Sequence, residues 1–188
     1  MELIGEQIIV LPRDIVWKAL NDPSVLSQCV PGCESFDLTG ESQYKVVMQV
    51  AVGPIRSRFT GKLLLSDIIA PHSYKISFDG SGGVAGSGKG HAVVKLEEVG
   101  EHTKLTYSVH AQVGGRLAQV GARLIDGVAK RMADLFFEKF KEKITMSESN
   151  DNSISNPSSV ALPKHNQGRW LLLVAVIAAA FVIFYTTR

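Results

Sequence analysis

The segment Ser81–Val99, SGGVAGSGKGHAVVKLEEV, decides between two fold classes. Gly83, Gly88 and Lys89 have the G-x-x-x-x-G-K spacing of a phosphate-binding loop, which would indicate an α/β nucleotide-binding protein. Such a loop continues with Ser or Thr and opens a helix, but here Gly90 follows and apolar and polar residues then alternate. The alternation is typical of a β-strand, so the segment predicts part of a sheet and argues against a nucleotide site.

The sequence on both sides of this segment predicts further strands and one long helix. Strand patterns cover residues 3–11, 44–52, 55–68, 74–80, 88–99 and 103–113, with turn residues between them. Two short helices are predicted between Pro12 and Pro31, and a long amphipathic helix from about Gly115 to Lys143. The predicted fold class is therefore α+β: a curved antiparallel sheet wrapped around a long C-terminal helix, with two short helices at one end.

Strand alternation also indicates what lies between the sheet and the helix. Gly86, Gly88 and Gly90 continue the inward-facing row of their strand, and inward glycines add no side-chain volume and let a sheet bend sharply. We interpret them as the hollow part of a sheet around a cavity for a hydrophobic ligand; simple curvature without a cavity is the alternative. The candidate cavity residues are Phe59, Leu63, Tyr74, Phe78, Gly88, Gly90, Tyr107, Leu117, Val120, Leu124 and Val128.

The predicted inner face does not favour an enzyme. Its only polar groups are Tyr44, Ser57, Tyr74 and Tyr107, and it offers no His, Asp or Glu for acid–base chemistry. His91 and His110 fall on the opposite face. No catalytic residue is predicted.

The remaining composition excludes other classes of protein. The formal net charge of +2 argues against a nucleic-acid partner. Cys29 and Cys33, in CVPGC, lack the further ligands that a zinc site requires, so we expect reduced, packed thiols and no metal site.

The C-terminal part of the chain predicts a membrane anchor. The run Trp170–Thr187 contains no charged residue, and a helix of this length reaches about 27 Å, enough to cross a bilayer. Residues 147–168, rich in Ser, Asn and Pro, predict a flexible linker. The expected organisation is a folded domain over residues 1–146, the linker, and a transmembrane helix over residues 169–188. Cations before the span, and an N-terminus without a basic leader, place the domain in the cytoplasm at the cell membrane.

Three blocks of the sequence resemble one known family. They are VWKALNDPSVLSQCVPGCESF from Val16, VGPIRSRFTGKLLLSD from Val52 and GGRLAQVGARLIDGVAKRMADLFFEKF from Gly114. Together they resemble the CoxG family of carbon monoxide dehydrogenase subunits, a branch of the START and Bet v 1-like superfamily with the helix-grip fold. The resemblance implies an accessory protein that helps to bring a molybdenum hydroxylase, such as aerobic carbon monoxide dehydrogenase, to the membrane. It implies no catalytic residue.

These observations favour a membrane-tethered binding module. Its expected partners are the cytoplasmic membrane, a molybdenum hydroxylase and a hydrophobic small molecule, for which a quinone is the natural candidate. No covalently bound cofactor is expected. The alternatives are a superfamily enzyme of the cyclase or hydrolase type, acting on a hydrophobic substrate, and a generic lipid-binding protein.

Overall fold

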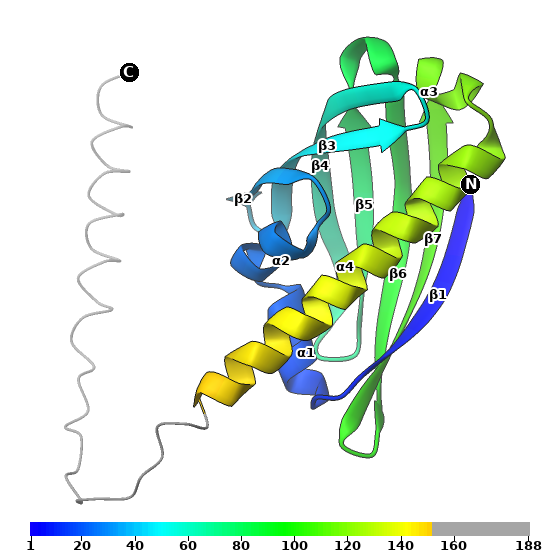
Figure 1. Cartoon of the computed structure of the whole chain (residues 1–188). Helices are drawn as coiled ribbons and strands as arrows, with labels where there is room; N and C mark the ends of the chain where they lie inside the picture. Colours follow the sequence, from blue (N-terminus) through cyan, green and yellow to red (C-terminus); the bar gives the residue numbers. More distant parts are fainter. Residues whose placement is uncertain (152–188) are drawn as a thin grey trace, which may run out of the picture. The chain divides into compact units, whose positions relative to one another are not determined.

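A computed structural model of the chain describes the backbone of residues 1–151 and the side chains of residues 1–146 (Figure 1). Seven strands form one antiparallel sheet in the order β1-β7-β6-β5-β4-β3-β2. The strands are β1 (Glu2–Ile9), β2 (Cys33–Gly40), β3 (Gln43–Val52), β4 (Ile55–Ile69), β5 (Ser73–Ser81), β6 (Ser87–Val99) and β7 (His102–Gly114). The helices are α1 (Arg13–Leu20), α2 (Pro23–Cys29), the short 3-10 helix η1 (Gly83–Ala85), α3 (Arg116–Gln119) and α4 (Ala122–Asp151).

The predicted α+β fold is confirmed. Strands β2 to β7 form a continuous meander, β1 pairs with β7, and α4 crosses one face of the sheet (Figure 1). The two predicted short helices correspond to α1 and α2, and Asp22 caps α2 by accepting a hydrogen bond from the Ser24 amide at 2.8 Å. The chain therefore follows the strand and helix patterns of its sequence over most of this domain.

Two elements differ from the prediction. Strand β2 was not predicted because CESFDLTG has no clean alternation; it is an edge strand whose pairing with β3 is interrupted by register shifts. The predicted single helix from Gly115 is divided into α3 and α4, because Gly121 adopts a positive φ of +95°. Helix α4 continues to Asp151, so the first residues of the predicted linker are helical.

The predicted anchor, and the linker after Asp151, lie outside the described residues. Within residues 1–151, no helix is both long enough and apolar enough to cross a membrane.

The hydrophobic core lies at the end of the sheet where α1 and α2 pack against α4. Phe137, Phe140 and Ile144, from the C-terminal half of α4, are buried together with Val16 and Leu20 of α1. The remaining core residues are Ile9, Cys29, Tyr74, Val94, Leu96 and Leu105. Because the core occupies this end, a cavity has room only towards the N-terminal half of α4.

Candidate functional site

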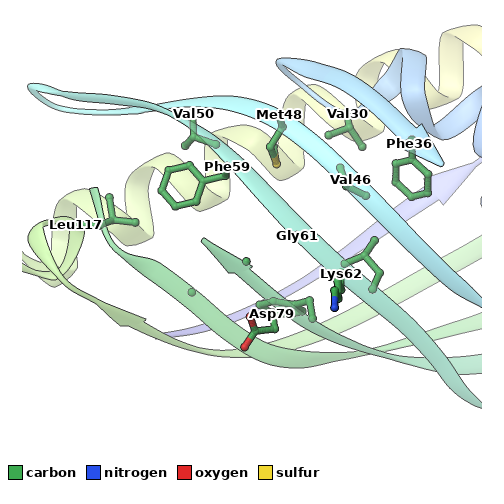
Figure 2. A pocket seen from close by; sticks show the side chains of 14 residues that line it. Val30, Phe36, Val46, Met48, Val50, Phe59, Gly61, Lys62, Asp79 and Leu117 are labelled. Atoms are coloured by element: carbon green, nitrogen blue, oxygen red, sulfur yellow. The ribbon is translucent and has the colours of Figure 1, made fainter. Parts of the chain in front are cut away.

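A cavity of about 350 Å³ lies away from the core, against strands β3 to β6 (Figure 2). Its wall combines side chains of these strands with residues of the α2–β2 region and with Leu117 of α3. The lining residues are Val30, Phe36, Val46, Met48, Val50, Phe59, Gly61, Lys62, Leu63, Phe78, Asp79, Gly80, Gly88 and Leu117. Twelve of these fourteen residues are apolar or glycine, so the wall suits a hydrophobic ligand.

The two charged lining residues do not point into the cavity. Lys62 and Asp79 are cross-strand partners, both are exposed, and each alternates along its strand with inward neighbours such as Leu63 and Phe78. Their side chains therefore lie on the outer face of the sheet. Among the described lining residues, no acid–base pair converges on a bound molecule.

Three glycines side by side form the floor of the cavity. Gly61 of β4 is the register partner of Gly80 of β5, which in turn is the partner of Gly88 of β6. A Cβ atom placed on any of them would meet its nearest neighbours at 3.5 Å or more, which is ordinary van der Waals contact. The absence of side chains here therefore creates empty volume rather than relieving a clash.

Five of the eleven predicted cavity residues line the cavity, and the others do not. The five are Phe59, Leu63, Phe78, Gly88 and Leu117. Tyr74 and Tyr107 lie instead with the core: the Tyr74 ring meets the Trp17 ring edge-on at 5.5 Å, and the Tyr107 ring stacks on Phe137 at 5.4 Å. Burial raises the pKa of both phenol groups, so both stay protonated and neutral in the physiological range.

Gly90 and the three helix candidates also lie off the cavity wall. A Cβ atom on Gly90 would fall on the carbonyl oxygen of His110, so this glycine permits a close approach of β6 and β7. Leu124 is 41% exposed and contacts the β3–β4 turn, where a Cβ on Gly53 would lie 2.9 Å from it. Val120 and Val128 are half-buried and are not part of the lining.

Several lining residues were not among the predicted site residues. Val46, Met48 and Val50 occupy alternate positions of the predicted strand 44–52, and Gly61 stands between the predicted residues Phe59 and Leu63. The same alternation could therefore have identified these four positions. Phe36 could not be found in this way because strand β2 was not predicted.

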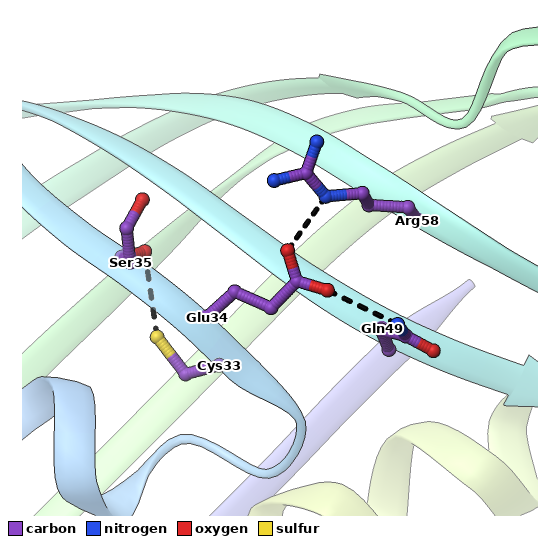
Figure 3. Close-up of polar contacts among 5 residues, drawn as sticks. All are labelled: Cys33, Glu34, Ser35, Gln49 and Arg58. Carbon is purple, nitrogen blue, oxygen red and sulfur yellow. Dashed lines mark hydrogen bonds and ion pairs between the residues drawn. The ribbon is translucent and has the colours of Figure 1, made fainter.

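An ion pair holds β2 in place beside the cavity (Figure 3). Glu34 of β2 accepts a hydrogen bond from Arg58 Nε of β4 at 2.6 Å and another from Gln49 Nε2 of β3 at 3.1 Å. These contacts hold the pKa of Glu34 below its usual value, the Arg58 hydrogen bond first and the Gln49 hydrogen bond second. They connect the edge strand to its neighbours and thereby support the position of Phe36 in the cavity wall.

We expect the two cysteines to react slowly with alkylating reagents. Cys29 is 1% exposed and Cys33 is half-buried, and burial raises the pKa of both thiols; Asp37 and Glu34 add to the effect at Cys33. A raised pKa leaves less reactive thiolate near pH ~8, so iodoacetamide should modify the native protein more slowly than a free cysteine, and Cys29 more slowly than Cys33. Mass spectrometry of tryptic peptides over time measures both rates. Equal rates in native and denatured protein would contradict this expectation.

The fold and the apolar cavity define a START-like domain. A START superfamily protein from Mycobacterium smegmatis has a TM-score of 0.63 at 8% identity, covering 77% of this chain and 97% of that chain. The Zhui aromatase/cyclase from Streptomyces sp. R1128 has a TM-score of 0.55 at 13% identity, covering 77% and 93%. At these identities the similarity concerns the fold alone.

The sequence itself identifies the family. Residues 5–145 match the model of the carbon monoxide dehydrogenase subunit family CoxG, and the chain belongs to this family. A conserved protein from Geobacillus kaustophilus is 34% identical, with a TM-score of 0.74, over 78% of this chain and 97% of that chain. No curated protein is similar enough in sequence to count as a match. The resemblance found in the three sequence blocks is thereby confirmed.

Proposed function

We propose that this protein binds a lipophilic small molecule in its cavity and serves as a non-catalytic accessory protein of a molybdenum hydroxylase at the cytoplasmic membrane. The observation that carries the proposal is the apolar cavity; the two charged residues among its described lining, Lys62 and Asp79, turn outward. Such a wall favours binding of an apolar molecule, since no buried polar group needs a partner there. Among the residues that the structure describes, the wall offers no groups that would activate a substrate.

An apolar cavity in an accessory protein of a membrane-associated hydroxylase favours a quinone as the ligand. A soluble dehydrogenase must pass its electrons to a carrier dissolved in the bilayer, and a protein with an apolar pocket shields the isoprenoid tail of such a carrier from water. A volume of about 350 Å³ lies in the lower part of the range for small-molecule sites. It suits a quinone ring with the first part of its tail.

The family and the predicted anchor support the recruiting role. The family description names carbon monoxide dehydrogenase, which makes a hydroxylase of this type the first partner to test. A tether raises the local concentration of the domain at the membrane, so a modest affinity for the soluble enzyme is sufficient for reversible recruitment.

The test is to purify the chain from its own host and to analyse the extracted small molecules by mass spectrometry. We expect a quinone to copurify, and to be depleted in a matched preparation of the cavity variant Gly88→Leu. An empty cavity, together with unchanged membrane association of the hydroxylase in a deletion strain, would overturn the proposal. Turnover of a hydrophobic substrate by the protein alone would favour the enzyme alternative.

The full chain is expected to behave as an integral membrane protein. The uncharged run Trp170–Thr187 should keep it in the membrane fraction after a carbonate wash. A chain that ends at Ser153 should be released as a folded, soluble domain, because the core residues and all seven strands lie within the compact unit Met1–Ser153. Recovery of the intact chain in the wash would rule out the anchor.

A further inference from the structure

Three segments form a closed ring at one end of the cavity. They are residues 52–57 around the β3–β4 turn, residues 82–86 around η1 and residues 114–125 from the end of β7 into α4, and we refer to them as the rim. The cavity residues Val50, Phe59 and Leu117 lie in or beside these segments, which places the rim at this end of the cavity.

Contacts join each rim segment to the next. Ser57 Oγ donates a hydrogen bond to the Gly82 carbonyl oxygen at 3.1 Å, which connects β4 to the η1 segment. The backbones of Gly86 and Gly115 lie against each other, since a Cβ on Gly115 would be 2.6 Å from Gly86 Cα. Leu124 contacts the turn at Gly53 and closes the ring.

The rim carries positive charge without acidic residues. Arg56, Arg116 and Arg123 are exposed, and the three segments themselves contain no Asp or Glu. The exposed Asp126 follows the third segment directly, so the three cations outnumber a single neighbouring carboxylate. None of these arginines forms an ion pair with another side chain of the described part of the chain. Arg58, just outside the rim, is different because Glu34 neutralises it.

The rim also exposes apolar side chains. Val84, in η1, is 87% exposed, more than any other large hydrophobic side chain in the described residues, and Leu124 is 41% exposed. The opposite end of β6 provides a contrast: Val99 is 51% exposed there, but Glu97 and Glu98 directly precede it in the chain. Exposed apolar side chains and unpaired cations on the same three connected segments match the interface of a bilayer that contains anionic lipids.

We propose that the rim docks the domain onto a membrane surface that contains anionic phospholipids. Val84 and Leu124 enter the headgroup layer, while Arg56, Arg116 and Arg123 contact lipid phosphates. A membrane is favoured over an acidic protein because Val84 projects from a loop tip and offers no concave surface to a folded partner. The inference rests on the proposed function in one respect: docking in this orientation presents the end of the cavity to the bilayer, where a lipophilic ligand is dissolved.

The docking is tested by quenching of an introduced tryptophan. Full-length Val84→Trp and the matched control Val99→Trp are reconstituted in vesicles of phosphatidylcholine, with or without phosphatidylglycerol, that contain brominated lipid. We expect the fluorescence added by Val84→Trp to be quenched when phosphatidylglycerol is present, and the fluorescence added by Val99→Trp to stay unquenched. Equal quenching in both variants, or none in Val84→Trp, overturns the proposal.

Charge variants test the role of the arginines. Each arginine is replaced in turn in the Val84→Trp protein, as Arg116→Gln or Arg123→Gln. Each replacement should lower the ratio of docked to undocked protein about fivefold, because each cation contributes to attraction by an anionic surface. Lys18→Gln and Lys95→Gln, which remove the same charge away from the rim, should leave the ratio unchanged. If the arginine variants lose binding of an acidic protein while vesicles never quench the introduced tryptophan, the rim is a protein interface and the proposal is wrong.

A parallel titration separates this inference from the proposed function. An apolar fluorescent probe is added to the same proteins in the absence of vesicles. Probe binding without quenching of the tryptophan introduced in the rim refutes docking and leaves ligand binding intact. Quenching without probe binding supports docking and contradicts the proposed ligand function.

Discussion

A chain with Gly88→Leu is expected to keep its fold and to lose at least about tenfold in affinity for an apolar probe. A Cβ on Gly88 would meet only the Gln112 carbonyl oxygen, at 3.9 Å, so the new side chain can extend into the cavity. An engineered cavity left by a truncated leucine measures about 150 Å³, so an added leucine removes a large share of the roughly 350 Å³ available. Fluorescence titration measures the affinity, and thermal unfolding reports the fold.

Gly90→Leu, two residues further along the same strand, is the matched control. Its Cβ would collide with the His110 carbonyl oxygen and would lie 2.9 Å from both Ala111 Cα and the Phe78 ring. Backbone atoms of β7 would have to move, so we expect a loss of about 3 kcal/mol or more in the free energy of unfolding. Unfolding of Gly88→Leu as well would mean that both glycines serve backbone geometry, and the cavity interpretation would lose its support.

The sequence predicted most of this fold because alternation and helical periodicity are local signals. Six of the seven strands and both short helices were expected at nearly their observed positions. Strand β2 was not predicted because its place in the sheet depends on long-range contacts, such as that of Glu34 with Arg58. No local sequence pattern encodes such contacts. The break in the helix at Gly121 was not predicted, because the apolar spacing continues through this residue whereas the helical backbone conformation does not.

The site was predicted only in part, for a related reason. Alternation identifies the face of the sheet on which a side chain lies, and it correctly placed Phe59, Leu63 and Phe78 on the cavity face. It does not say how far along the sheet the core ends and the cavity begins. That boundary depends on where the aromatic residues of α4 pack, and they occupy the end where Tyr74 and Tyr107 lie. Gly88 and Gly90 of β6 show the same limit. Alternation places both on the inner face, but only Gly88 lines the cavity, while Gly90 permits the close approach of β7.

A substitution in the core should lower the stability of the domain, whereas Gly88→Leu in the cavity should not. Phe140 is completely buried, its ring stacks on that of Phe136 at 5.7 Å, and it belongs to the core that joins α4 to α1 and the sheet. Truncation to alanine removes this burial and leaves a void that its neighbours fill only in part, so Phe140→Ala should cost about 3–5 kcal/mol. That is a large fraction of the roughly 5–15 kcal/mol typical of a domain.

Urea unfolding of the chain ending at Ser153 measures this loss, with Met146→Ala as the control on the same helix. Met146 is 58% exposed, so its truncation should change the free energy of unfolding by no more than about 0.5 kcal/mol. None of the described residues that line the cavity belongs to α4. The folded fraction of Phe140→Ala should therefore bind an apolar probe with nearly unchanged affinity. A loss of affinity comparable to that of Gly88→Leu would show instead that packing of α4 on the core controls the shape of the cavity. A loss of stability below about 1 kcal/mol would contradict the central place given to Phe140 in the core.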